Sequence, residues 1–326
     1  MEFNKKNHPT TRMRSLFICF ISFLLATASA FAQQEAQISQ YWALPGYLNP
    51  GAIASNDRLT VAALDRMQWT GVPNAPKTFF ITAEMPFRML KKKHGLGVIV
   101  VNDRAGLFAN TDFALQYAFR LKLWEGELSL GIRAGATSQS FDGEKVDIPD
   151  TPDHAPSADD IPRTKVSAMA FDAGFGVHYT HRLFYAGLSA SHLPEPELEL
   201  DEKSYIQLKR VYYLTAGGNI ALRNPLYELH PSFLLKSTFQ TTQVDISLRM
   251  VYNKMFWGGI SYRWKDAIVM MAGAEIKGIR IGYSYDIGTS AMAKVSNGSH
   301  EIFASYALKL DLSPKTKNKH KSIRIL

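Results

Sequence analysis

Cysteine is almost absent from this sequence. Cys19 is the only one in 326 residues, and it lies within an N-terminal segment that has the features of a cleaved leader. Removal of that segment leaves a chain with no disulfide framework and no thiol nucleophile. The residue before Cys19 is Ile18, where a lipidation site carries a small residue, so the sequence also argues against a lipoprotein.

Long apolar runs are missing too. The run from Leu16 to Ala28 is shorter than the roughly 20 residues that a transmembrane helix needs, and no later stretch approaches that length. Basic residues precede the run, and Ala30-Phe31-Ala32 follows it with small residues at the two positions that a signal peptidase reads. We therefore predict a cleaved signal peptide over residues 1–32. If the mature chain spans a membrane, it does so as a closed β-barrel.

A basic face is also lacking, although the formal charge is +8. Four basic groups and one acid lie in residues 1–32, and five basic groups lie in residues 313–326, so residues 33–312 are formally neutral. A nucleic-acid-binding domain concentrates its basic groups on one face of the folded body. We therefore exclude nucleic acid as a partner and interpret residues 313–326 as a basic C-terminal tail.

The chain does contain a strong alternation of apolar and polar residues. Val244, Ile246, Leu248 and Met250 alternate with polar neighbours, and residues 279–286 repeat the pattern. Apolar groups at every second position share one face of a strand but lie on opposite sides of a helix. About fourteen such segments, separated by turn residues, predict an all-β domain over residues 58–312. Residues 33–57 lack any period and are interpreted as a periplasmic lead-in.

The number of strands decides which way the apolar face points. A barrel of about eight strands can fill its interior with side chains, whereas about fourteen strands enclose a lumen too wide for that. We therefore expect an up-and-down antiparallel transmembrane barrel with its apolar face toward lipid and a polar lumen. Aromatic residues near predicted strand ends, such as Trp124, Trp257 and Trp264, suit interfacial girdles.

Loop lengths provide an independent check on the barrel. The longest predicted loops, 140–165, 193–208 and 287–298, all follow odd-numbered strands and therefore lie on one side of the sheet. Outer-membrane barrels have long outer loops and short periplasmic turns. The pattern favours a barrel over the alternative, a soluble β-sandwich.

A series of short motifs runs through the chain. Two lie near its start, Tyr47-Leu48-Asn49-Pro50-Gly51 and Arg66-Met67-Gln68-Trp69, and Ala75-Pro76-Lys77-Thr78 follows them. Later motifs are Gln116-Tyr117-Ala118-Phe119, Pro231-Ser232-Phe233-Leu234-Leu235-Lys236 and Gly298-Ser299-His300-Glu301-Ile302. The ordered set covers essentially the whole mature chain and resembles the PorP/SprF family of type IX secretion system outer-membrane proteins.

This resemblance implies a non-enzymatic barrel without a cofactor in the outer membrane of a Bacteroidetes species. Members of the family support protein secretion or, in the SprF branch, place and hold a secreted adhesin at the cell surface, with a link to gliding motility. The implied partners are a secreted surface protein (cargo or adhesin), other type IX secretion components and outer-membrane lipid.

The motifs and the alternation together supply candidate site residues. Arg66 shares one strand face with Leu64 and Gln68, while Trp69 faces the other way, so we expect Arg66 to point into the lumen. It should find a carboxylate there, from Asp245, Asp286 or Glu301, because an unpaired buried charge is costly. The interaction candidates from the motifs are Asn49, Pro50, Arg66, Gln68, Trp69 and Pro76. The predicted lumen-facing charges are Arg133, Asp245, Arg249, Arg280, Asp286 and Glu301.

Two other functions remain open at this point. A passive outer-membrane channel or small-molecule transporter would also suit the lumenal charges. A membrane-embedded hydrolase would require histidine and serine to converge at one rim, and the sequence has neither a nucleophile-elbow pattern nor a recognised metal motif. We therefore expect no catalytic residue and no metal ligand. The histidines in question are scattered over separate segments: His178, His181, His192, His230 and His300.

Overall fold

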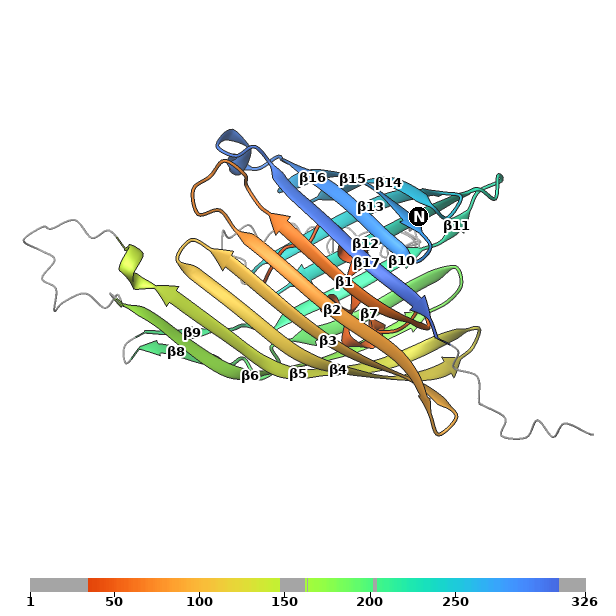
Figure 1. Cartoon of the computed structure of the whole chain (residues 1–326), viewed down its shortest axis with the longest axis horizontal. Coiled ribbons are helices and arrows are strands. Elements are labelled where there is room, and N and C mark those ends of the chain that lie inside the picture. Colours follow the sequence, from red (N-terminus) through yellow and green to blue (C-terminus); the bar gives the residue numbers. More distant parts are fainter. Residues whose placement is uncertain (1–34, 147–161, 163, 202–203, 311–326) are drawn as a thin grey trace, which may run out of the picture.

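The computed structural model is a closed, 14-stranded antiparallel β-barrel (Figure 1). It describes residues 35–146, 162, 164–201 and 204–310, so the predicted signal peptide and the basic tail lie outside the described residues. Each wall strand pairs with its neighbour along the chain, and pairing of the first with the last closes the ring. The wall strands are β1 (Arg58–Met67), β2 (Lys77–Met89), β3 (Lys92–Ala105), β4 (Phe108–Leu123), β5 (Gly126–Asp142), β6 (Lys165–Thr180), β7 (Phe184–Ser191), β10 (Val211–Gly218) continued by β11 (Ile220–Ala221), β12 (Tyr227–Ser237), β13 (Thr242–Tyr252), β14 (Phe256–Arg263), β15 (Ala267–Ile276), β16 (Ile279–Gly288) and β17 (Ser299–Lys309).

The predicted all-β barrel of about fourteen antiparallel strands is confirmed. One predicted strand, 209–222, is interrupted, because β10 and β11 keep the same register against β12 but are separated at Asn219. By that register Gly218 faces Pro231, which has no N–H to donate to the ladder. The predicted loop 193–208 contains a short hairpin, β8 (Glu197–Asp201) and β9 (Ser204–Gln207).

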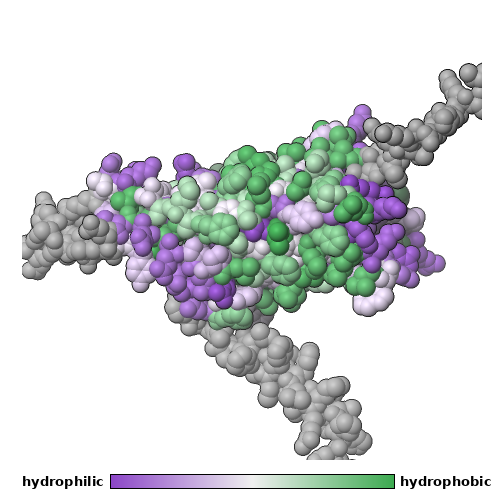
Figure 2. Space-filling model, turned by 90° about the horizontal axis from the view of Figure 1, so that it is seen from below, coloured by the Kyte–Doolittle hydropathy of each residue, from purple (hydrophilic) through white to green (hydrophobic). Residues whose placement is uncertain are grey.

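The apolar face of the wall points outward. In β13, Ile246 is 57% exposed whereas its neighbour Asp245 is 1% exposed. Hydrophobic side chains gather across the middle of the face seen in Figure 2, with hydrophilic side chains at both ends. This is the arrangement that a lipid bilayer stabilises. Trp124 and Trp264 are exposed as a girdle requires, but the prediction for Trp257 was wrong, because it is buried in the lumen against Trp42.

The two ends of the barrel differ in the length of their connections. At the short-turn end, Leu90-Lys91 and Asn253-Lys254 join neighbouring strands with positive φ at both residues, as tight hairpin turns require. The described residues at the long-loop end are 68–76, 143–146, 162, 164, 192–201, 204–210 and 289–298, which include η3 (Gly143–Lys145) and η4 (Ala291–Lys294). The β8–β9 hairpin projects there beside β6 (Figure 1). Long loops face outward and short turns face the periplasm in outer-membrane barrels.

Residues 35–57, which we call the plug, lie inside the lumen rather than in the periplasm, so the lead-in interpretation is corrected. The plug contains η1 (Tyr41–Ala43), α2 (Pro45–Leu48) and η2 (Pro50–Ala52). Its apolar side chains, Ile38, Tyr41, Leu44, Tyr47 and Leu48, form one hydrophobic cluster with inward-facing wall residues such as Phe80 and Phe303. The wide lumen is filled by this segment instead of by wall side chains alone. None of the helices among the described residues is long and apolar enough to cross a membrane.

Candidate functional site: the plug and its contacts with the wall

Arg66 lies in the lumen and joins the plug to two wall carboxylates. Its Nη2 is 2.8 Å from Asp286 Oδ2, and its Nη1 is 3.3 Å from Glu301 Oε2. The backbone N–H groups of Ser39 and Gln40 each donate to Glu301 at 2.7 Å. The Ser39 hydroxyl accepts from Arg66 at 2.8 Å and lies within hydrogen-bonding distance of Asp286. One guanidinium thus holds the start of the plug against β1, β16 and β17.

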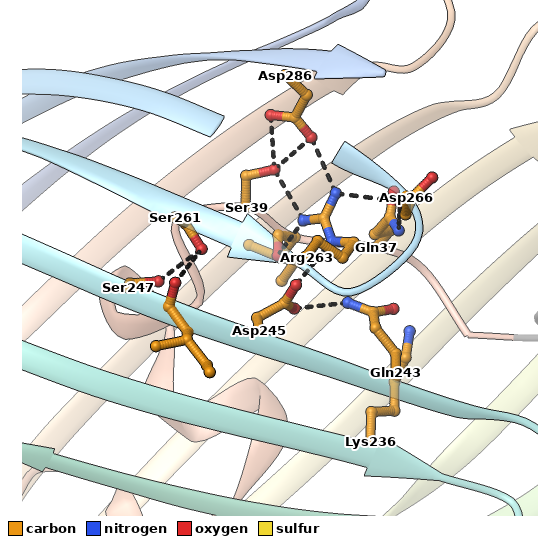
Figure 3. A network of polar contacts seen from close by, with 12 residues as sticks. Gln37, Ser39, Lys236, Gln243, Asp245, Ser247, Ser261, Arg263, Asp266 and Asp286 are labelled. Carbon is orange, nitrogen blue, oxygen red and sulfur yellow. Dashed lines mark hydrogen bonds and ion pairs between the residues drawn. The ribbon is translucent and has the colours of Figure 1, made fainter. Parts of the chain in front are cut away.

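Arg263, which was not among the predicted site residues, extends this network to the third candidate carboxylate (Figure 3). Its Nε is 2.9 Å from Asp245 Oδ1, and its Nη1 is 3.0 Å from Asp286 Oδ2. Asp245 therefore pairs with Arg263 rather than with Arg66. All of these side chains are nearly inaccessible, and removing one partner of a buried pair costs about 3–5 kcal/mol. The alternation with outward-facing Tyr262 was the signal that could have placed Arg263 in the lumen.

Asn49 and Pro50 attach the middle of the plug to the opposite wall. The Asn49 side chain accepts from the Gly51 N–H at 2.8 Å, which caps η2, and donates to the carbonyl oxygen of Val177 at 2.9 Å. Pro50 is the first residue of η2, where its missing N–H is not needed. The wall is glycine at the point of contact, because a Cβ on Gly131 would lie 2.2 Å from the Gly51 nitrogen.

A second ionic cluster fixes the plug near the long-loop end. Glu35 accepts from Tyr47 at 2.5 Å and lies 2.6 Å from His192 Nε2, while His192 Nδ1 lies 3.1 Å from Asp172. Asp172 also pairs with Arg133 at 3.4 Å, so Arg133, one of the predicted lumen-facing charges, belongs to this cluster. Burial disfavours the imidazolium, but the two carboxylates outweigh it and raise the pKa of His192 to about 10. His192 therefore carries a proton at neutral pH.

A third cluster lies at the short-turn end, where the plug leads into β1. Arg120 donates to the Ala54 carbonyl oxygen at 2.8 Å and pairs with Asp57 at 2.6 Å. Lys93 bridges Asp57 and Glu127 at 2.6 and 2.7 Å. The plug is therefore held by charged groups at both of its ends and by Asn49 between them. The alternation of apolar and polar residues could not predict these ion pairs, because the plug that they hold has no such alternation.

The other motif residues connect two outer loops. β1 ends at Met67, so Gln68 leaves the strand instead of sharing a face with Arg66, and its N–H donates to the Pro76 carbonyl oxygen at 2.9 Å. Trp69 has a positive φ of 48°, and its N–H donates to the Ser299 hydroxyl at 3.0 Å. These contacts close loop 68–76 and fasten it to the start of β17. The predicted position of Trp69 on the strand is corrected accordingly.

The remaining predicted lumen charges are separate from the Arg66 network. Arg249 stacks on the Trp42 ring, with its guanidinium carbon 3.5 Å from the ring centre. Arg280 pairs with Glu275 at 2.7 Å near the short-turn end. Within the described ranges, His, Cys, Asp and Glu side chains form no group of three or more that could hold a metal ion.

A barrel with this motif series matches a known protein family. The family model described as "Type IX secretion system membrane protein PorP/SprF" matches residues 30–306. The chain belongs to the PorP/SprF family. Family membership and the barrel fold point to the outer membrane, and the expected resemblance is confirmed over most of the chain.

Several solved barrels match this PorP/SprF chain at low sequence identity. A deletion mutant of the TodX monoaromatic hydrocarbon channel is 8% identical with a TM-score of 0.46, over 78% of this chain and 90% of that chain. A Pseudomonas aeruginosa FadL homologue is 12% identical with a TM-score of 0.44, over 81% and 93%. BamA from Haemophilus ducreyi is 8% identical with a TM-score of 0.41, over 77% and 70%. No curated protein sequence matches the chain.

Proposed function

We propose that this barrel helps to secrete a partner protein through the type IX system or anchors that partner at the cell surface. The plugged lumen is the observation that carries the proposal. The plug is bound to the wall from Glu35 to Asp57 and packs its apolar side chains against it. Because the plug fills the lumen, we assign binding of the partner to the loop surface. The partner itself is assigned to the class of secreted, adhesin-like proteins. The role is non-enzymatic and needs no cofactor.

The long-loop end offers a formed surface for such a partner. In β8, Leu198 and Leu200 are buried, whereas Glu197 and Glu199 point outward, so the hairpin is fixed to the barrel through one face. β8 contacts β5 and β6, two long strands that are paired with each other in the wall. An acidic hairpin held against the barrel at the same end as the fastened loop 68–76 can present main-chain and carboxylate groups to a secreted protein.

The proposal is tested by purifying the tagged protein from native outer membrane and identifying what co-purifies. A second strain carries a short Gly-Ser turn in place of residues 197–207, and antibody labelling of intact cells measures surface display of the co-purifying protein. The matched control changes Asn253-Lys254, a turn at the opposite end, to Asn-Gly. We expect loss of display only in the hairpin variant at equal barrel abundance. Unchanged display in that variant would remove the hairpin from the proposed interface.

A passive channel or small-molecule transporter is the second candidate. It is favoured by a hollow of about 590 Å³ at the short-turn end, which Arg58, Glu275 and Arg280 help to line. Conductance of the purified protein in planar bilayers separates the two functions. A steady open pore supports transport, whereas a closed pore supports anchoring.

Arg66→Ala with undiminished surface display would exclude a direct role of Arg66 in the interface.

A further inference from the structure

A smaller cavity adjoins the hollow at the short-turn end and lies between the plug and one sector of the wall. It measures about 190 Å³ and is lined by the plug together with β6, β7, β10, β12 and β13. Trp42, Pro45, Ser55 and Asn219 line both this cavity and the 590 Å³ hollow. Entry is therefore from the short-turn end, opposite to the loop surface of the proposed function.

One lining residue is a cation without an anion. Arg249 stacks on Trp42 and is half-buried, yet it makes no ion pair or hydrogen bond with any residue that the structure describes, and its Nε is fully enclosed. The other lumenal arginines behave differently, because Arg66, Arg133 and Arg263 each face a carboxylate. A half-buried guanidinium has lost hydrogen bonds to water, and an anionic partner would replace them with charge-assisted hydrogen bonds.

The surroundings of Arg249 define what such a partner would be. The Tyr41 hydroxyl and Ser232 hydroxyl, 2.9 Å apart, supply a polar edge, while Trp42, Leu48 and Pro231 supply apolar walls. A guanidinium matches a carboxylate in a planar, two-bond geometry. The volume is below the roughly 300–1,000 Å³ of sites for drug-sized ligands, so the cavity suits a group about the size of one amino-acid residue.

We propose that this cavity is a binding site for a carboxylate carried on a compact apolar group, entering from the periplasmic side. Arg249 binds the carboxylate, and the face of Trp42 with its neighbours covers the apolar group. The carboxylate belongs either to the C-terminal residue of a polypeptide or to a small organic acid. The site is independent of the loop surface, so it stands or falls separately from the anchoring role.

Isothermal titration of the full-length purified barrel tests the site. The probes are 3-phenylpropionate, 3-phenylpropionamide, and acetyl-Gly-Gly-Phe with a free or an amidated C-terminus. We expect each acid to bind about tenfold or more tightly than its amide, as a charge-assisted hydrogen bond implies. Binding of the peptide acid assigns the carboxylate to a chain terminus, and binding of 3-phenylpropionate alone assigns it to a small acid. Equal affinity of acid and amide for the wild-type protein overturns the proposal.

Variants locate the binding energy. Arg249→Gln should lower the affinity for the acid to that for the amide. Arg249→Lys should retain part of the difference in affinity, because lysine keeps the positive charge but lacks the planar guanidinium that binds a carboxylate through two hydrogen bonds. Lys254→Gln is the matched control, since Lys254 lines the larger hollow and its side chain is 82% exposed. Acid binding that survives Arg249→Gln in a barrel with normal heat-modified gel mobility also overturns the proposal. The acid-to-amide ratio of the wild type decides the matter if that variant does not fold.

Discussion

A single added methyl group at Gly131 should displace the plug without harming the barrel. The Cβ of Gly131→Ala would lie 2.2 Å from both the Gly51 nitrogen and the Pro50 carbonyl carbon. These are backbone atoms, so no flexible side chain can move aside. β5 is held on both sides by β4 and β6, with Gly131 opposite Ala118 and Gly176, so the plug is the part that must shift.

The expected cost follows from overpacking. Inserting a methyl group into a packed interior costs about 1–3 kcal/mol. If this cost falls on the docked state, the population of the displaced plug rises by roughly 5- to 150-fold. Hydrogen exchange of peptides covering residues 46–54, read by mass spectrometry, should accelerate by the same factor. Peptides from β4 and β6 should keep their protection, because the wall ladder is unchanged.

Gly258→Ala is the matched control for this experiment. Gly258 lies in β14 on the outward face, and a Cβ there would meet only the Met271 carbonyl oxygen at 3.8 Å, an ordinary contact. Alanine in a strand loses less backbone entropy than glycine, so this variant should be neutral or slightly more stable. If Gly131→Ala exchanges at the rate of Gly258→Ala, the plug does not pack on the wall as described.

Three further perturbations address the clusters that hold the plug. Arg66→Ala leaves Asp286 and Glu301 buried without that partner, so plug docking should weaken by about 3–5 kcal/mol, measured by exchange of residues 37–41, with partial recovery in Arg66→Lys. Asn49→Ala removes a cap and a contact with the wall and should cost about 1–2 kcal/mol by the same measurement. The protonated His192 stabilises the docked plug fully below pH 6.5, the ordinary pKa of histidine, and this contribution is lost as pH rises through its raised pKa of about 10. Protease protection of the plug should therefore fall over that interval, and His192→Gln should flatten the profile.

The wall was predictable from sequence because lipid-facing and lumen-facing side chains alternate along every strand. A residue such as Ile246 must face lipid when its neighbour Asp245 faces the lumen, and that constraint repeats along every strand. The same alternation placed Arg66 inside the barrel. Its pairing with Glu301 could not be read from sequence, because the register between β1 and β17 exists only once the ring has closed.

The plug was missed because it has no period to read. Its conformation is set by the lumen around it, through short helical turns, Asn49 and the glycine at position 131. A different signal was present, since Tyr41, Trp42, Leu44, Tyr47 and Leu48 are too apolar for a segment that lies in water. Fourteen strands also leave a lumen wide enough to hold a segment of the chain.

The inner face of the wall limits how the plug can move. Leu64, Phe80 and Phe303 point into the lumen and are at most 1% exposed, because the plug covers them. Exposing a large apolar side chain to water costs about 1.5–3 kcal/mol, so these three residues alone oppose complete removal of the plug by roughly 5–9 kcal/mol. A partner that opened the lumen would have to supply that energy on binding, and the upper value corresponds to submicromolar affinity. Opening by thermal motion alone is therefore rare, whereas local shifts at single contacts such as Gly131 are within reach.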